Sequence, residues 1–185
     1  GDPNPPVIEP GDFCSQTQGG WGTDTCNGNN TACLRDDYFA GLFPSGLVVG
    51  DADGPDGDDS YAILLTSSSA IADLLPTGGT PAALTADQTD PETTSSGVFG
   101  AQLVAATLNV TFDSYGIGKC ILIGDCDFAY APGTLGTLVY GDCVAAALQG
   151  LSVNDVIALS NVALAGDGLP AGVSFSDLNE ALSIL

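Results

Sequence analysis

The 185-residue sequence is 44% hydrophobic and carries a formal net charge of −21, with Arg35 and Lys119 as its two basic residues. This length and hydrophobic content suit one globular domain with a core, and they argue against a wholly disordered chain. The strong negative charge repels phosphate groups, which argues against nucleic acids and anionic membranes as partners.

Residues 1–12 form a proline-rich segment that precedes the predicted globular domain, residues 13–185. The prolines favour an extended or polyproline conformation. One interpretation is a flexible leader, and the other is an arm that docks on a neighbouring subunit by strand addition. The candidate contacts of such an arm are Pro5, Pro6, Val7 and Ile8.

In chain order, the first half of the domain predicts short strands and helices. Residues 13–18 alternate as a strand does and lead into a glycine-rich turn around Trp21. Apolar residues at helical spacing predict a helix over 34–43. Apolar runs then predict strands at 47–49 and 61–66, followed by a short helix over 67–75.

Two helices are predicted next. Thr80 followed by Pro81 is typical of a capped helix start, which predicts a helix over 81–86. Ser95 or Ser96 is expected to cap the longest helix, which runs to about residue 113 with an apolar stripe. Further strands are expected at 120–123 and 135–140.

The C-terminal part predicts an αα-hairpin. Ser152 and Asp155 have the spacing of a capping box, which starts a helix that reaches about Leu164. After a glycine-rich loop, Ser174 or Ser176 is expected to cap the last helix, through Leu182. The predicted fold class is therefore α+β, with several helices packed on a small, mainly antiparallel sheet.

Six cysteines and the absence of histidine favour disulfide bonds over a zinc site. Sequence proximity favours the pair Cys26–Cys33 and then Cys120–Cys126, which leaves Cys14–Cys143 to join the two ends of the domain. Disulfides form in oxidising compartments. Because the sequence has no methionine and no apolar stretch of membrane-spanning length, we interpret it as a secreted chain whose signal peptide has been removed.

Catalysis is not expected from this composition. Without histidine there is no Ser-His-Asp or Cys-His system, and the commonest general base is missing. No glycine-rich loop is followed by the lysine that a phosphate-binding loop needs. We therefore predict a protein that is not an enzyme.

The strongest local signal is an acidic loop with the sequence Gly-Asp-Ala-Asp-Gly-Pro-Asp-Gly-Asp-Asp, residues 50–59. Its aspartates can converge on a hard cation such as Ca²⁺, which prefers six to eight oxygen ligands. The loop is not an EF-hand, because Pro55 and Ala62 stand where that motif needs ligands. The alternative interpretation is a solvated acidic turn. The candidate calcium ligands are Asp51, Asp53, Asp56, Asp58 and Asp59.

Three other residues are candidates for contacts with sugars. Trp21 lies between glycines and could stack on a sugar ring, although a tryptophan that covers the core is the commoner case. Asn29 and Asn109 each begin an N-glycosylation sequon. A packed helix around Asn109 would make that sequon inaccessible.

Several turn motifs resemble an uncharacterised module of secreted bacterial cell-surface proteins. The motifs are Gln-Gly-Gly-Trp-Gly at 18–22, Phe-Pro-Ser-Gly at 43–46, Leu-Pro-Thr-Gly-Gly-Thr-Pro-Ala-Ala-Leu at 75–84 and Ser-Gly-Val-Phe at 96–99. The C-terminal hairpin, with Asp-Leu-Asn at 177–179, is similar to the end of such modules. The resemblance implies an extracellular or cell-surface role and brings no catalytic residues. The cysteines and the acidic loop depart from its pattern.

Two functions follow as expectations. In the first, the protein is a secreted structural subunit that self-associates into an extracellular filament or surface assembly, using the segment 1–12. In the second, it is a monomeric adhesin module that binds a glycan or surface with the help of Ca²⁺. The expected partners are other copies of the chain in the first case and a surface glycan in the second.

Overall fold

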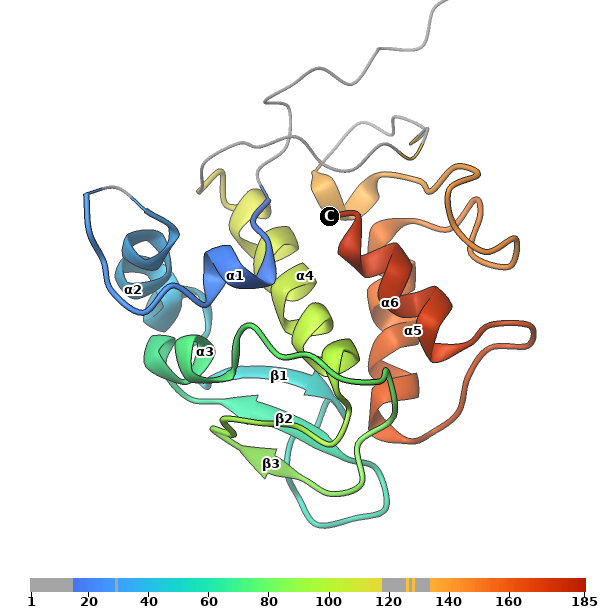
Figure 1. The fold of residues 1–185 in the computed structure, drawn as a ribbon, viewed down its shortest axis with the longest axis horizontal. Coiled ribbons are helices and arrows are strands. Elements are labelled where there is room, and N and C mark those ends of the chain that lie inside the picture. Colours follow the sequence, from blue (N-terminus) through green and yellow to red (C-terminus); the bar gives the residue numbers. More distant parts are fainter. Residues whose placement is uncertain (1–14, 29, 118–125, 127, 129–133) are drawn as a thin grey trace, which may run out of the picture.

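The computed structural model describes residues 15–28, 30–117, 126, 128 and 134–185, and these residues form an α+β fold. A three-stranded sheet lies beside a group of helices (Figure 1). The helices are α1 (Gln18–Trp21), α2 (Thr31–Leu42), α3 (Ser68–Leu74), α4 (Val98–Ser114), the 3₁₀ turn η1 (Leu135–Thr137), α5 (Val153–Ala165) and α6 (Phe175–Ser183). The strands are β1 (Leu47–Gly50), β2 (Ala62–Leu65) and β3 (Gln88–Thr89).

The sheet has the order β1-β2-β3, so β1 is an edge strand. Strands β1 and β2 are antiparallel, with Val49 opposite Ile63. The two-residue strand β3 is parallel to β2. The predicted strands at 47–49 and 61–66 are confirmed as β1 and β2, and the small sheet is mixed because the short β3 joins it in parallel.

Helix α4 is the centre of the core. It lies between α1 and the pair α5–α6 (Figure 1), and ten of its seventeen residues are buried. A helix buried on most of its sides must be apolar almost all round, which fits its sequence. The N-cap of α4 is Gly97 and not the predicted Ser95 or Ser96. This position requires glycine, because φ is 58° and a Cβ would lie 2.3 Å from the Thr80 carbonyl oxygen.

The predicted C-terminal αα-hairpin is confirmed. Ser152 and Asp155 form a full capping box at the start of α5, and Ser174 and Asp177 form another at the start of α6. Hydrogen bonds from the serine hydroxyl and backbone lower the pKa of both aspartates. The buried face of α6 packs on α4 through Leu178, Ala181 and Leu182. Tyr140 donates its hydroxyl hydrogen to the Ala181 carbonyl at 2.8 Å, and burial raises its pKa.

Three predicted elements are wrong in the described part. Residues 15–17 are not strand, and the glycine-rich segment after them is the short helix α1, capped by Thr17. Residues 81–86 form no helix, because the Ala82 and Leu84 N–H groups donate to the distant carbonyls of Ser96 and Leu164. Residues 135–140 contain η1 and one bridge instead of a strand. The strand predicted at 120–123 and the arm residues 1–12 lie outside the described residues.

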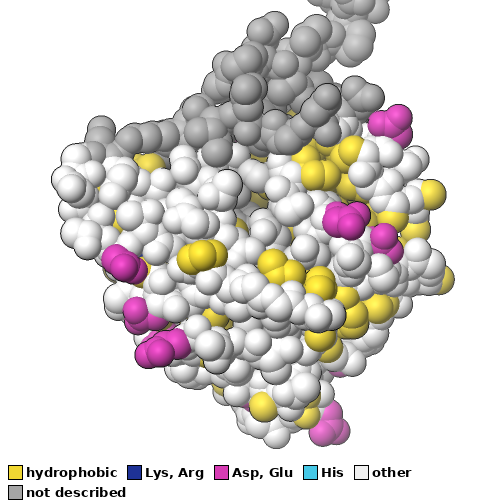
Figure 2. All heavy atoms as spheres, viewed as in Figure 1, with side chains coloured by type: hydrophobic (Ala, Val, Ile, Leu, Met, Phe, Trp, Pro, Cys, Tyr) yellow, Lys and Arg dark blue, Asp and Glu magenta, His cyan; other side chains and the backbone are white. Residues whose placement is uncertain are grey.

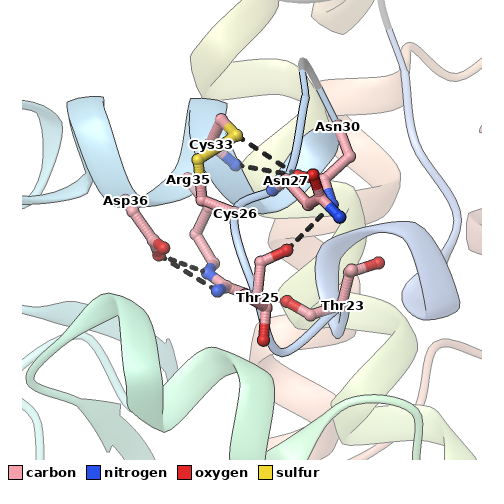
Figure 3. The surroundings of a disulfide bond; sticks show 8 residues. All are labelled: Thr23, Thr25, Cys26, Asn27, Asn30, Cys33, Arg35 and Asp36. Carbon is pink, nitrogen blue, oxygen red and sulfur yellow. Dashed lines mark hydrogen bonds and ion pairs between the residues drawn. A yellow bond between two sulfur atoms is a disulfide. The ribbon is translucent and has the colours of Figure 1, made fainter.

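Two disulfide bonds are present in the described part. Cys26–Cys33 is confirmed and joins the loop before α2 to its first turn (Figure 3). Cys126 pairs with Cys143, so the predicted pairs Cys120–Cys126 and Cys14–Cys143 are wrong. Proximity in the sequence selected the wrong partner for Cys126, because the chain returns to it from seventeen residues away. Cys14 and Cys120 lie outside the described residues.

None of the helices in the described part is both long and apolar enough to cross a lipid bilayer.

Candidate metal site

The acidic loop connects the antiparallel strands β1 and β2, and its ends are fixed by the sheet. The Asp51 N–H donates to the Tyr61 carbonyl at 3.0 Å, which extends the ladder by one rung. Gly50 has φ of 95°, and a Cβ there would lie 2.4 Å from the Tyr61 oxygen, so this position requires glycine. The turn that follows is closed by a bond from the Gly54 N–H to the Asp51 carbonyl, at 3.1 Å. The loop therefore leaves the sheet with a defined direction.

Three of the five predicted ligands converge. One carboxylate oxygen from each of Asp51, Asp56 and Asp58 lies within 4.8 Å of the other two. Asp51 is half-buried, and Asp56 and Asp58 are exposed. Asp53 and Asp59 are not members of this cluster. The prediction of a five-aspartate site is thus reduced to a cluster of three.

Short hydrogen-bonded turns hold the loop aspartates in place. The Asp51 carboxylate accepts the Asp53 N–H at 3.4 Å, Asp56 accepts the Asp58 N–H at 3.0 Å, and Asp58 accepts the Ser60 N–H at 2.7 Å. In each of these bonds the acceptor is one carboxylate oxygen, Oδ1, of the aspartate. This is the local bonding that favours Asp over Glu in turns, because the shorter side chain reaches the backbone two residues on.

Two distant aspartates attach the loop to the rest of the fold. Asp87 accepts the Gly57 N–H at 3.1 Å on one oxygen and the Ala62 N–H at 2.9 Å on the other. The Asp167 carboxylate accepts the Ser60 hydroxyl at 2.8 Å. Sequence reasoning did not find these two residues, because each is an isolated aspartate with no motif around it.

Among the described residues, no basic side chain balances the charge of the cluster. Arg35 is the single Lys or Arg in the part of the chain that the structure describes, and it is buried and paired with Asp36 at 3.0 Å. Figure 2 shows acidic side chains scattered over one face of the molecule, without a described basic side chain among them. One oxygen from each of three carboxylates is fewer than the six to eight that Ca²⁺ prefers, so second carboxylate oxygens, water or backbone oxygens would complete its coordination.

Trp21 is not a platform for a sugar ring. Its side chain is 2% exposed and packs against Phe112, with ring centroids 4.8 Å apart. Its indole N–H donates to the Asn109 side-chain oxygen at 2.9 Å. The proposed glycan contact is therefore wrong, and the alternative of a core tryptophan is correct.

Asn109 is not available for glycosylation in the folded protein. It lies on α4 and is 1% exposed, and its side-chain amide bonds to Trp21 and Gln16. A buried, fully engaged amide cannot carry a glycan without opening the core. Asn29 lies outside the described residues.

No protein-family model, curated protein or solved structure matches this chain.

Proposed function

We propose that this protein is an extracellular binding module whose acidic loop takes Ca²⁺, and that it acts by binding and not by catalysis. The observation that carries the proposal is the convergence of Asp51, Asp56 and Asp58 within 4.8 Å on a loop whose ends the sheet fixes. The two disulfides in the described part are compatible with an oxidising, extracellular compartment.

Calcium suits this site better than other common cations. The three cluster members offer oxygen alone, which favours hard cations over zinc or copper. Two of them are exposed, and an open, irregular site fits the flexible geometry of Ca²⁺ better than the strict octahedron of Mg²⁺. Extracellular calcium modules of this kind bind with dissociation constants of about 0.1–1 mM.

Addition of calcium is expected to stabilise the protein, and chelation is expected to reverse the effect. At about 10 mM Ca²⁺ and that affinity, the gain in free energy of unfolding is about 1.4–2.7 kcal/mol. The double substitution Asp56→Asn and Asp58→Asn should abolish the gain, because it removes two of the three clustered carboxylates. The measurement is the thermal melting temperature with calcium and with chelator.

The matched control is Asp53→Asn with Asp59→Asn, which removes the same charge from the same loop but lies outside the cluster. It should keep the full response to calcium. An equal loss of response in both double variants would show general charge screening instead of a site. A wild-type melting curve that calcium leaves unmoved would end the calcium proposal.

A second candidate is self-association into a filament or surface assembly. Exposed apolar side chains favour it, in particular Tyr115 at 68% and Val162 at 48% exposure. Copies with a net charge of −21 repel one another, so we expect association in calcium or high salt and monomers in low salt. Size-exclusion chromatography, with and without residues 1–12, measures this. A monomer under every condition, whatever the truncation, would exclude assembly.

A further inference from the structure

The edge strand β1 has backbone groups that no described residue pairs with. The N–H groups of Gly50 and Ala62, which are opposite each other, donate to the side chains of Asn161 and Asp87, so both point away from the β1–β2 ladder. Outward-pointing pairs alternate along an antiparallel ladder, so the next such pair is Val48 and Leu64.

The hydrogen bonds of β2 on its other side confirm that the backbone of Leu64 points away from β1, because the Leu64 carbonyl accepts the Asp90 N–H at 2.9 Å. The Val48 N–H and C=O therefore face the open edge of β1. No described residue forms a hydrogen bond with them there.

A hollow of about 570 Å³ lies along this edge. One wall is β1 with the start of the acidic loop, and the other wall is α5 with the residue that follows its C-cap. The lining residues are Val48, Gly50, Asp51, Ala52, Ala158, Asn161, Val162, Ala165 and Asp167.

At the Gly50 end of the hollow, the Asn161 side chain connects β1 to α5. Its side-chain oxygen accepts the Gly50 N–H at 2.8 Å, and its side-chain nitrogen donates to the Ile157 carbonyl at 3.1 Å. The edge is thus satisfied at Gly50 and open at Val48. Such an edge pairs readily with another extended chain.

The lining has a simple chemistry. The apolar part consists of small or short side chains, among them Ala158, which is exposed, and Val162, which is 48% exposed. The charged lining residues are Asp51 and Asp167, and none of the described residues around the hollow is basic. The hollow therefore complements an extended segment that carries positive charge beside small apolar groups.

We propose that this hollow binds an extended, lysine- or arginine-containing peptide segment of another protein, which adds a strand to the free edge of β1. Main-chain hydrogen bonds to Val48 would give affinity, and the two carboxylates would select basic side chains. The four residues of β1 set the length of the contact, roughly 13 Å at the usual rise of a strand.

A second copy of this chain fits the hollow poorly. Its net charge is −21, and Arg35, the one basic residue in the described part, is buried. The partner is therefore a different, basic protein. Asp51 belongs both to this lining and to the aspartate cluster, so peptide binding is measured without calcium.

The test uses a fluorescent peptide of alternating lysine and valine, measured by fluorescence anisotropy in about 0.15 M salt, where long-range attraction is largely screened. Wild type should bind it. The variant Ala158→Trp, which fills the hollow from an exposed helix position, should bind at least about tenfold more weakly. Asp167→Asn should weaken binding about three- to tenfold, whereas Asp73→Asn, an equal charge change on α3, should leave it unchanged.

Two control peptides separate strand addition from charge attraction. A peptide of the same sequence with N-methylated backbone keeps its charge but cannot pair, and it should not bind. An alternating glutamate–valine peptide should not bind either. Equal binding by the methylated peptide, or by Ala158→Trp, would overturn the proposal. So would self-association of wild type that Ala158→Trp abolishes, since the occupant would then be a second copy.

The melting temperature of Ala158→Trp, with and without calcium, shows whether the variant is folded and whether its acidic loop is intact. If it keeps the wild-type response to calcium but loses the peptide, the loss comes from the filled hollow and not from damage to the acidic loop. Failure of the calcium proposal leaves this result untouched, because the peptide is measured without calcium.

Discussion

Replacement of Asn109 by leucine is expected to lower the free energy of unfolding by about 2–5 kcal/mol, which is a large part of the stability of a domain this size. Leucine has a similar volume and suits the apolar helix α4, so the loss comes from hydrogen bonds and not from shape. The measurement is urea unfolding followed by far-ultraviolet circular dichroism, which also reports on variants that lack Trp21, the chain's single tryptophan.

The physical reason is that Asn109 joins two parts of the chain to α4 inside the core. Its side-chain oxygen accepts the Trp21 indole N–H at 2.9 Å and the Gln16 N–H at 2.7 Å. Its side-chain nitrogen donates to the Gln16 carbonyl at 3.0 Å and to the Leu185 carbonyl at 3.5 Å. A buried polar group that loses its partner costs about 1–3 kcal/mol, because water cannot replace the bond.

A double-mutant cycle isolates the buried pair. Trp21→Phe keeps an aromatic ring against Phe112 and removes the indole donor. If the bond matters, the double variant with Asn109→Leu should lose less stability than the sum of the two single variants, by about 1 kcal/mol or more. Additive losses would show that the two side chains act independently.

Elements with a complete local signal were predictable from the sequence. The capping boxes at Ser152 and Ser174 each place the serine and its aspartate three residues apart, and both helices begin there. The apolar runs that became β1 and β2 are buried on the side that faces the core. In these segments the local preference and the tertiary packing agree, so the pattern was sufficient.

Elements set by long-range bonds were not predictable. Residues 81–86 have a helix-start signal, but their N–H groups bond to Ser96 and Leu164, and this tertiary pairing overrides the local preference. The same applies to β3, a two-residue strand without an apolar run. Each depends on which segments meet in space, and no local pattern in the sequence indicates that.

In the candidate site, too, the residues that are close in the sequence were predictable and the distant ones were not. The Asp51–Asp59 loop was visible because its aspartates are close in the sequence, and the structure reduces them to Asp51, Asp56 and Asp58. Asp87 and Asp167, which hold the loop, are 25 or more residues from their partners. The hollow beside β1 was also invisible, because its lining comes from a strand edge and a helix far apart in the sequence.

Replacement of Arg35 by methionine is expected to destabilise the protein by about 2–4 kcal/mol. Arg35 is 1% exposed on α2, and its guanidinium donates to the carbonyls of Trp21 at 2.6 Å and Thr23 at 2.9 Å. Figure 3 shows it beside the Cys26–Cys33 disulfide, directed towards Asp36. Methionine fills part of the space but donates nothing, so two carbonyls lose a charged donor. Urea unfolding measures the loss.

The comparison with Asp36→Asn identifies which of these contacts matters. Asp36 is 37% exposed, and asparagine keeps an oxygen that can accept the guanidinium N–H, so we expect a loss below about 1 kcal/mol. A large effect of Arg35→Met with a small effect of Asp36→Asn would assign the stabilisation to the backbone carbonyls. Equal losses would assign it to the ion pair. On the first outcome, the one described cation in this strongly acidic chain joins α1 to α2 within the fold and is not a contact for a ligand, because its donors are already bonded to the protein.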